Sequence, residues 1–322
     1  MTEQMDAAII ESLGSAPVVR SMPKPVVGHG QALVRMRAAA LNFADLLKAE
    51  GSYQERQDCP FICGLEGAGE IVARDDEGIF TPGQRVAVNM PGTVAEYVAA
   101  PVSACLEIPE AMHFEQAAGF QIAYGTSHFA LSGRGALKAG ETLVVLGAAG
   151  GVGLTAVQIG RALGARVIAV ARGADKIDLL REEGADLVID SDTCPDLKDA
   201  LRAAGGVDVV YDPVGDTAGR AAFGALHQNG RFLVIGFAGG KPPELPLNHA
   251  LVKNISIHGY YFGGLRKSAP DAVRDSLQQS LALFADGRLR PHVGQVLPIS
   301  GIAEGFELLR QRKAVGKVII QL

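Results

Sequence analysis

The sequence lacks the features that would tie a protein to a membrane, to nucleic acid or to secretion. No apolar run approaches the ~20 residues of a membrane-spanning helix, and the polar residues 1–6 precede a short apolar stretch that Glu11 interrupts. The 30 basic and 35 acidic residues are scattered and leave a formal net charge of −5, so a large surface for nucleic acid is not expected. These absences predict a cytoplasmic protein with no membrane and no nucleic-acid partner.

Cysteine is scarce, and neither cysteine nor histidine shows the spacing of a metal or redox site. The seven histidines include no H-E-x-x-H motif, and the four cysteines, irregularly spaced and without a C-x-x-C motif, are Cys59, Cys63, Cys105 and Cys194. We expect reduced, mostly buried thiols. With 48% apolar and 20% charged residues among 322, the composition is that of a globular protein large enough for two domains.

The centre of the chain carries the clearest local pattern. Residues 143–146 are all apolar and predict a buried strand, residues 154–163 predict a helix, and residues 165–170 predict a second strand. Together these segments form a βαβ unit, with a glycine-rich turn between its first strand and its helix.

That turn fits the pattern G-x-G-x-x-G, with Ala148 in place of the first glycine and Gly150 and Gly153 at the other two. The glycines let the chain turn tightly, let a pyrophosphate approach the backbone and let the helix pack on the strand. The N–H groups at the start of the helix then hold the pyrophosphate. We predict dinucleotide binding through Ala148, Gly150, Gly151, Val152 and Gly153; the alternative is a degenerate fold that no longer binds.

On either side of this unit the pattern differs. Short apolar runs separated by turn residues predict a β-rich domain in the first third, with a short helix at 43–50. From about residue 115 helices and strands alternate as far as 254–261, which implies a doubly wound parallel sheet covered on both faces. After Gly263 two further helix–strand pairs follow, and the pattern leaves open whether this tail extends the sheet domain or returns to the first domain.

Short motifs spread over nearly the whole chain resemble those of the medium-chain dehydrogenase/reductase superfamily, in particular its zinc-free NADPH:quinone oxidoreductase (ζ-crystallin-like) branch. The motifs lie at residues 40–45, 64–69, 83–86, 123–126, 147–153, 208–215 and 316–318. The resemblance implies an α/β protein with a GroES-like β-barrel catalytic domain and a Rossmann doubly wound domain that binds NADPH. The implied boundaries are 1–120 for the first part of the barrel domain, 121–264 for the NADPH-binding domain and 265–322 for the return, with substrate in the cleft between the domains.

Zinc-dependent members of the superfamily hold a catalytic metal with a cysteine, the histidine of a G-H-E motif and a second cysteine. At the matching positions this chain has Asn42, Leu65 and Ile122, of which leucine and isoleucine offer no lone pair and asparagine is a poor zinc ligand. The cysteine-rich loop of the structural zinc is missing too. The resemblance therefore implies no metal, and a substrate carbonyl must be polarised by hydrogen-bond donors instead.

Two residues are candidates for the chemistry. Asn42 matches a family position close to the nicotinamide and the substrate; its alternative role is to cap the helix that begins at Phe43. Tyr53 matches a tyrosine of related enoyl thioester reductases, whose phenol can donate a hydrogen bond or a proton; alternatively it is a loop residue that covers the barrel mouth.

The residues after the second strand of the βαβ unit indicate the preferred cofactor. NAD-specific proteins place an acidic residue there to bind the ribose 2′-hydroxyl. This chain has Arg172 and Lys176, which can neutralise a 2′-phosphate, and no carboxylate before Asp175, so we predict NADPH; a solvated basic pair is the alternative. Relatives often carry a tyrosine near the phosphate after the next strand, where this chain has Ser191.

Further cofactor contacts follow from the resemblance, each with a structural alternative. Thr126 matches a nicotinamide contact or is a helix-interior threonine, and Asp212 matches a loop near the adenosine or caps the next helix. Gly236 and Phe237 end a strand where ligands of open α/β sheets lie. Lys317 matches a basic residue that reaches the cofactor in some relatives, or is a solvated lysine.

The predicted function is an NADPH-dependent, zinc-independent oxidoreductase that transfers hydride to a small-molecule quinone or α,β-unsaturated carbonyl. One alternative is an enoyl-CoA or acryloyl-CoA reductase, and another is a non-catalytic NADPH-binding protein of the crystallin type. Relatives pair through the edge of the nucleotide domain, so a homodimer is expected, with residues 254–261 at that edge. Tyr260 and Tyr261 are interpreted as core or dimer-edge residues.

Overall fold

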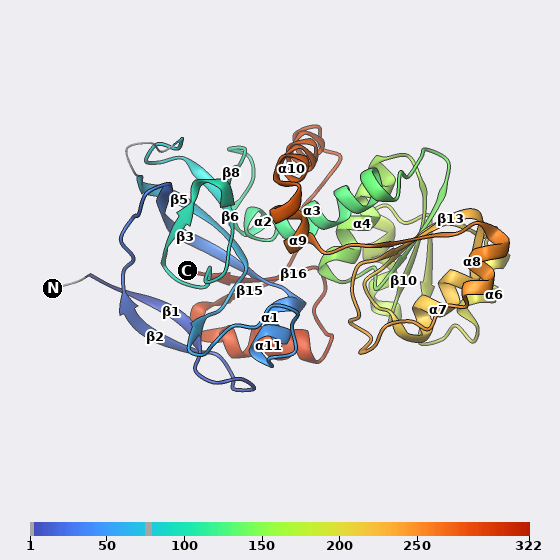
Figure 1. The fold of residues 1–322 in the computed structure, drawn as a ribbon, viewed down its shortest axis with the longest axis horizontal. Helices are drawn as coiled ribbons and strands as arrows, with labels where there is room; N and C mark the ends of the chain where they lie inside the picture. Colours follow the sequence, from blue (N-terminus) through green and yellow to red (C-terminus); the bar gives the residue numbers. More distant parts are fainter. Residues whose placement is uncertain (1–2, 75–78) are drawn as a thin grey trace. The chain divides into compact units, whose positions relative to one another are not determined.

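The chain forms two compact units. In the computed structural model, which describes residues 3–74 and 79–322, the first unit comprises Met1–Ile122 and Pro291–Leu322, and the second comprises Ala123–Arg290. The C-terminal residues therefore belong with the N-terminal ones, and Figure 1 shows the red end of the chain lying among its blue strands.

Antiparallel pairing dominates the first unit. Its strands are β1 (Gln4–Ile10), β2 (Val18–Pro23), β3 (Gln31–Leu41), β4 (Phe61–Ile62), β5 (Glu66–Arg74), β6 (Arg85–Asn89), β7 (Tyr97–Pro101), β8 (Cys105–Glu107), β15 (Val293–Pro298) and β16 (Lys317–Gln321). One sheet has the order β15-β16-β3-β5-β6-β8, with β7 also paired to β3, and a smaller sheet has the order β2-β1-β4. The long strand β3 is central because three other strands pair with it.

The helices of the first unit are short. They are α1 (Phe43–Ala49), α2 (Phe114–Ala118) and α11 (Ile302–Arg310), while α3 (Phe120–His128) crosses from the first unit into the second. The helix predicted at 43–50 is confirmed as α1. Gly119 separates α2 from α3, and a Cβ there would lie 2.9 Å from the stem of the Lys317 side chain. Glycine at this point makes room for that lysine.

The second unit has a single parallel sheet. Its elements are β9 (Thr142–Leu146), α4 (Gly151–Ala162), β10 (Arg166–Ala171), α5 (Ile177–Glu182), β11 (Leu187–Asp190), α6 (Leu197–Ala203), β12 (Val207–Asp212), α7 (Asp216–Ala225), β13 (Leu226–Val234), α8 (Leu247–Lys253), β14 (Ser256–Gly259), α9 (Phe262–Ser268) and α10 (Pro270–Ala285). The strand order β11-β10-β9-β12-β13-β14 places the first strand in the middle, and every pairing is parallel. The predicted doubly wound sheet is confirmed.

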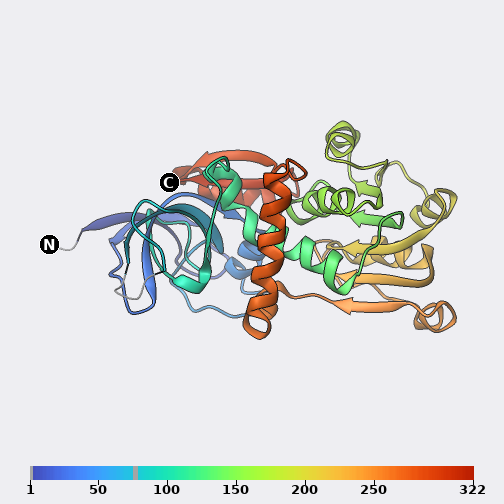
Figure 2. The same ribbon diagram turned by 90° about the horizontal axis from the view of Figure 1, so that it is seen from above.

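The chain returns to the first unit later than residue 265, where the resemblance placed the return. Helices α9 and α10 group with the second unit, and the return begins at Pro291. Figure 2 shows α10 as the long orange-red helix. It stays with the second unit because it buries Val273 and Leu277, and because Ser276 Oγ lies 2.8 Å from Nδ1 of the buried His128 on α3.

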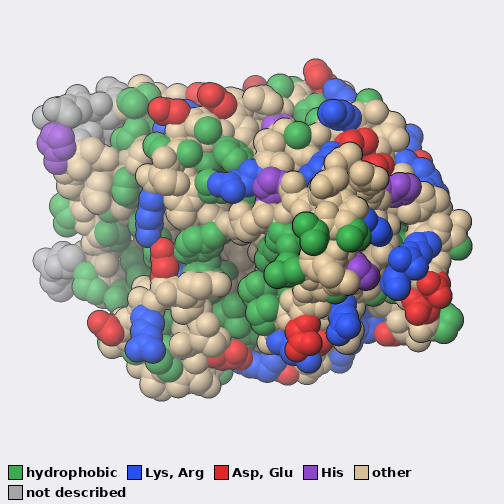
Figure 3. Space-filling model, turned by 45° about the vertical axis from the view of Figure 1, so that its right-hand side comes forward, with side chains coloured by type: hydrophobic (Ala, Val, Ile, Leu, Met, Phe, Trp, Pro, Cys, Tyr) green, Lys and Arg blue, Asp and Glu red, His purple; other side chains and the backbone are tan. Residues whose placement is uncertain are grey.

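The surface carries both signs of charge. On the face drawn in Figure 3, lysine and arginine side chains are interspersed with aspartate and glutamate. Among residues 3–74 and 79–322, no helix has the length and apolarity to cross a membrane.

Candidate active site

Three strand ends meet in the first unit. Asn42 directly follows β3, Glu66 is the first residue of β5, and Lys317 is the first residue of β16. Because β3 runs antiparallel to both neighbours, with Ala40 opposite Glu66 and Leu41 opposite Val318, these three side chains come from the same edge of the sheet. Residues far apart in the sequence are thus brought together by strand pairing alone.

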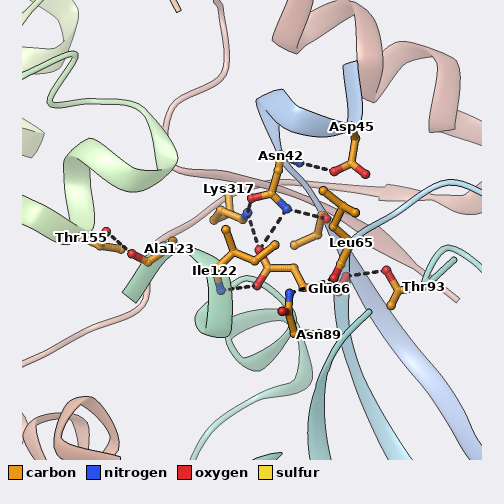
Figure 4. A network of polar contacts seen from close by, with 11 residues as sticks. Asn42, Asp45, Leu65, Glu66, Asn89, Thr93, Ile122, Ala123, Thr155 and Lys317 are labelled. Atoms are coloured by element: carbon orange, nitrogen blue, oxygen red, sulfur yellow. Dashed lines mark hydrogen bonds and ion pairs between the residues drawn. The ribbon is translucent and has the colours of Figure 1, made fainter. Parts of the chain in front are cut away.

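The three side chains form a closed polar network (Figure 4). Lys317 Nζ donates to Glu66 Oε1 at 2.8 Å and to Asn42 Oδ1 at 2.7 Å, and Asn42 Nδ2 donates to Glu66 Oε1 at 3.1 Å. The second carboxylate oxygen, Glu66 Oε2, accepts the backbone N–H of Ile122 at 2.9 Å. Glu66 is fully buried and Lys317 is 7% exposed, so each charge depends on the other rather than on water.

The positions that hold zinc ligands in zinc-dependent relatives surround this network. Figure 4 shows Asn42, Leu65 and Ile122 grouped around Glu66 and Lys317. Neither Leu65 nor Ile122 has a side-chain donor for a metal, and Ile122 contributes only its backbone N–H. Across the part of the chain that the structure describes, no three His, Cys, Asp or Glu side chains are grouped so as to hold a metal ion. The ammonium of Lys317 supplies positive charge here.

Neighbouring polar groups hold the network in place. The Thr93 hydroxyl donates to the Glu66 carbonyl at 2.9 Å, and Asn89 Nδ2 donates to the Leu65 carbonyl at 3.0 Å. The Asp45 carboxylate accepts the backbone N–H of Asn42 at 2.8 Å. Burial raises the pKa of Asp45 to about 6, although the Asn42 N–H and the Lys317 ammonium act in the opposite direction. Asn42 is therefore fixed through both its backbone and its side chain.

Tyr53 lies beyond the other end of α1. That helix has seven residues and a length of about 10 Å, with Asn42 before its first residue and Tyr53 in the loop after its last. The Tyr53 ring is half-buried, and Lys48 Nζ lies 5.5 Å from its centre. The structure thus brings Asn42 and Lys317 together, and it sets Tyr53 beside Lys48 in the last turn of α1.

In the second unit the glycine turn joins β9 to α4, and the start of α4 packs closely against the turn. A Cβ on Gly153 would lie 2.2 Å from the Gly147 carbonyl oxygen, whereas a Cβ on Gly150 would meet that oxygen at 3.4 Å. Gly153 is therefore required for close packing of the helix on the turn, and the backbone at Gly150 stays approachable. Gly151, Val152 and Gly153 form the first turn of α4, whose N–H groups have no acceptor within the helix.

Ala148 has a different role from the glycines. Its N–H donates to the Val170 carbonyl at 3.0 Å, so it ties the turn to the end of β10. The preceding Gly147 has a φ of +57°, a left-handed conformation that favours glycine and starts the turn. Ala148 thus shapes the site through its backbone.

The basic residues after β10 have acidic neighbours. Lys176 Nζ donates to the Arg172 carbonyl at 2.7 Å, and Arg172 Nε lies 3.9 Å from Asp192 Oδ1. Asp190 Oδ1 accepts the N–H of Gly173 at 3.0 Å, and hydrogen bonds from the backbone of Asp192 and Gly173 lower the pKa of this carboxyl. The fold therefore brings carboxylates from the end of β11 beside Arg172, which the order of residues after β10 does not reveal.

Other predicted contacts lie at the carboxyl ends of these parallel strands. Ser191, directly after β11, donates its backbone N–H to the Ala171 carbonyl at 2.8 Å. Gly236 follows β13 and donates to the Asp212 carbonyl at 3.2 Å, and the neighbouring Phe237 is exposed. Strand direction places these residues at one edge of the sheet, outside which ligands of open α/β sheets bind.

Asp212 ends β12 and is almost completely buried. Its Oδ1 accepts the N–H groups of Val214 at 2.8 Å and Gly215 at 2.7 Å, so it shapes the loop before α7. Its Oδ2 has no hydrogen-bond partner and faces Gly219, where a Cβ would lie 2.3 Å from that oxygen. Burial raises the pKa of Asp212 to about 6, against the two backbone hydrogen bonds that lower it.

Thr126 is buried on α3 beside a chain of hydroxyl groups. Ser127 Oγ lies 2.8 Å from Thr155 Oγ1 on α4 and 2.9 Å from the Tyr211 hydroxyl on β12, and it donates to the Val152 carbonyl at 3.0 Å. These contacts fasten α3 to the start of α4. Ser127, Thr155 and Tyr211 could not be predicted from the sequence, because nothing in their spacing shows that they meet.

Glu66 is the site residue that sequence analysis overlooked. It lies in the motif at residues 64–69, where the resemblance draws attention to Leu65 as the counterpart of a zinc ligand. A signal was present, since a lone glutamate among glycines and small apolar residues at the start of a strand is a candidate buried charge that requires a partner. The partner, Lys317, lies 251 residues away.

Comparison with known proteins is consistent with both units. The profile of the alcohol dehydrogenase GroES-like domain matches residues 28–110, and that of the zinc-binding dehydrogenases matches residues 151–280. Quinone oxidoreductase-like protein 2 of Bos taurus is 35% identical over 98% of this chain and 92% of its own length. A probable oxidoreductase from Mycobacterium abscessus superposes with a TM-score of 0.91 at 32% identity, covering all of both chains.

The quinone oxidoreductase of Thermus thermophilus superposes with a TM-score of 0.88 at 32% identity, covering 99% of this chain and all of the other. The predicted pairing of a GroES-like domain with a doubly wound sheet is thereby confirmed. The chain belongs to the medium-chain dehydrogenase/reductase superfamily and, within it, to the zinc-free quinone oxidoreductase branch.

Proposed function

We propose that the protein is an NADPH-dependent reductase that transfers hydride to quinones or α,β-unsaturated carbonyls without a metal. The observation that carries the proposal is the network at the zinc-ligand positions, where Asn42 stands in for one metal-binding side chain and is hydrogen-bonded to a buried ion pair. Leucine and isoleucine cannot bind zinc, so a substrate oxygen must be stabilised by hydrogen-bond donors.

The second unit has the groups needed to bind the phosphates of NADPH. The first-turn N–H groups of Gly151, Val152 and Gly153 would hold the pyrophosphate, and Arg172, whose side chain is exposed, would meet a 2′-phosphate. The Thermus thermophilus relative was solved as a complex with NADPH, which supports the same cofactor here. When bound, NADPH supplies the hydride.

Asn42 would stabilise the developing oxyanion. A carboxamide has two N–H groups; one donates to Glu66, and the amide nitrogen makes only a long hydrogen bond of 3.5 Å to the Ala40 carbonyl besides. This second N–H is available for a substrate oxygen on which negative charge develops. The phenol of Tyr53 would donate the proton that completes the reduction.

The test is NADPH consumption with a panel of quinones, enones and an enoyl-CoA ester, by the wild type and by an Asn42→Ala variant. We expect turnover of the small acceptors and a loss of roughly 100-fold in kcat on removing the amide. NADPH binding without turnover of any acceptor would instead support the non-catalytic alternative. A clear preference for the CoA ester over the matching enone would support the enoyl-CoA reductase.

We also propose that two copies pair through β14. Among the described residues this strand pairs only with β13, so its outer edge is open, and Ile257 on it is exposed. The helix α8, which leads into β14, exposes Leu247, Leu251 and Val252. An open edge strand next to exposed apolar side chains is suited to pairing with a second copy of itself.

Light scattering tests this assembly. We expect a dimer for the wild type and a monomer for a Leu251→Glu/Ile257→Glu variant, because two charges would have to be buried in the interface. A wild-type protein that is monomeric at micromolar concentration would contradict the proposal.

A further inference from the structure

We infer that Glu66 and Lys317 are positioning residues whose ion pair fixes the amide of Asn42 in one orientation. The inference rests on the proposed function, because it concerns how Asn42 is presented to substrate. It gives Glu66 a role and changes that of Lys317, which sequence analysis assigned to cofactor binding.

The two charges determine which way the amide faces. An ammonium only donates hydrogen bonds and a carboxylate only accepts them. The Asn42 oxygen must therefore face Lys317 and its nitrogen must face Glu66, as the distances of 2.7 Å and 3.1 Å show. A flipped amide would meet a donor with a donor and an acceptor with an acceptor. This orientation therefore satisfies both charged partners and sets the amide nitrogen on the Glu66 side of the network.

Burial makes the arrangement rigid. Water cannot replace either charged partner, since Glu66 is fully buried and Lys317 is 7% exposed. The carboxylate is anchored from behind by the Ile122 N–H at 2.9 Å, and the lysine stem lies against Gly119, where a Cβ would be only 2.9 Å away. The ion pair can therefore transmit a fixed geometry to Asn42.

The pair also polarises the amide. An ammonium on the carboxamide oxygen draws electron density away from the nitrogen, which strengthens the N–H groups as donors, as in other chains of hydrogen bonds. Lys317 thereby acts on the reaction through Asn42. A cofactor-binding role predicts instead that its loss acts on NADPH affinity.

The decisive variant replaces both charges by apolar side chains, Glu66→Leu/Lys317→Met, so that no unpaired charge stays buried. If the pair positions Asn42, we expect a folded protein with kcat reduced roughly 100-fold and KM for NADPH changed less than about threefold. Glu66→Gln/Lys317→Met should recover part of kcat, because the new amide can both donate to and accept from Asn42.

A second ion pair on the same strands provides the control. Arg37 Nη2 on β3 lies 2.9 Å from Glu70 Oε2 on β5, and both side chains are about one-third exposed. The matched variant Arg37→Met/Glu70→Leu should leave kcat unchanged. A kcat near the wild-type value in Glu66→Leu/Lys317→Met would overturn the inference, as would a large rise in KM for NADPH with kcat preserved.

A readout without turnover separates this inference from the proposed function. In protein labelled with ¹⁵N-asparagine, the Asn42 side-chain signals are identified by their loss in Asn42→Ala. We expect slow hydrogen exchange at Asn42 in the wild type and fast, solvent-like exchange in Glu66→Leu/Lys317→Met. Unchanged exchange would overturn the positioning role, whatever the activity. Faster exchange, in a protein whose wild type reduces no acceptor, would support the positioning and refute the proposed reaction.

Discussion

Each unit of the protein buries one carboxylate at the end of a strand, and the two are stabilised in different ways. Glu66 receives hydrogen bonds on both oxygens, from Lys317, Asn42 and the Ile122 backbone. Asp212 receives two backbone hydrogen bonds on one oxygen and none on the other. The first carboxylate is compensated by an opposite charge, and the second only by local backbone dipoles.

The difference shows how each site depends on the rest of the fold. Partners of Asp212 lie two and three residues further along the chain, so the loop between β12 and α7 can form this contact locally. The partners of Glu66 come from the residue after β3, from the first residue of β16 and from the start of α3, and they require the pairing of β3 with both β5 and β16. A change in one partner should therefore be far more damaging around Glu66 than around Asp212.

The largest effect is expected for Lys317→Met. It leaves Glu66 buried with no opposite charge, which costs about 3–5 kcal/mol of unfolding free energy. The pair of Arg37 and Glu70, about one-third exposed, offers the control, because Arg37→Met should cost at most about 1 kcal/mol. Denaturant unfolding of both variants measures the difference, and equal losses would show that Glu66 does not depend on its ammonium.

Unlike Lys317→Met, Asp212→Asn should raise the free energy of unfolding at neutral pH. The pKa of Asp212 is raised to about 6, so between pH 4 and 6 the folded protein binds more protons than the unfolded chain, and its stability falls as the pH rises. A shift of this size corresponds to about 3 kcal/mol. Asparagine keeps the oxygen that accepts from Val214 and Gly215 and carries no charge.

We therefore expect the stability of Asp212→Asn, relative to wild type, to increase by up to about 3 kcal/mol between pH 4 and pH 7. Urea unfolding at the two pH values measures it, while the other buried acid with a raised pKa, Asp45, contributes equally to both proteins. A stability difference that does not change with pH would mean that Asp212 is ionised at both values, and the contrast with Glu66 would be lost.

The same contrast explains which parts of the site could be predicted from the sequence. The glycine turn depends on neighbours within one βαβ unit, and the alternating strands and helices of the doubly wound sheet are visible as local hydrophobic periodicity. The Glu66 network depends on strand register in a sheet that joins residues 42, 66 and 317, and no local pattern carries that information. Only the resemblance to known proteins pointed to Asn42 and Lys317.

Acidic neighbours of Arg172 were missed for a related reason. The residues directly after β10 include no carboxylate before Asp175, but parallel pairing of β10 with β11 sets Ala171 opposite Asp190. The loop after β11 is therefore a second source of charge at the same edge. The return to the first unit likewise begins at Pro291 and not at residue 265. The contacts that keep α10 with the second unit are tertiary, so the local sequence does not reveal them.

Gly153→Ala probes how closely the local contacts of the second unit are packed. A Cβ only 2.2 Å from the Gly147 oxygen must displace α4, which we expect to cost about 1–3 kcal/mol and to abolish NADPH binding. The matched change, Gly150→Ala, meets the same oxygen at 3.4 Å and should fold normally, with NADPH affinity reduced about tenfold because the methyl group obstructs the pyrophosphate. Unfolding curves and fluorescence titration separate the two, and equal stability of both variants would refute the packing argument.

The smallest effect is expected for Asp192→Asn, where charge compensation is weakest. Asp192 Oδ1 lies 3.9 Å from Arg172 Nε, and both side chains are more than half exposed, so the pair contributes at most about 1 kcal/mol. If Arg172 meets the 2′-phosphate of NADPH, removing its competing carboxylate should tighten binding of adenosine 2′,5′-bisphosphate by up to about fivefold and leave 5′-AMP unaffected. Arg172→Ala should weaken binding of the bisphosphate alone.

Calorimetry at low and high salt measures these affinities, because screening by salt must reduce the increase in affinity for the bisphosphate. An equal change for both nucleotides would show that the carboxylate acts on the loop rather than on the phosphate. The geometry around Arg172 would then be determined by contacts between side chains, as it is around Glu66, and not by the backbone.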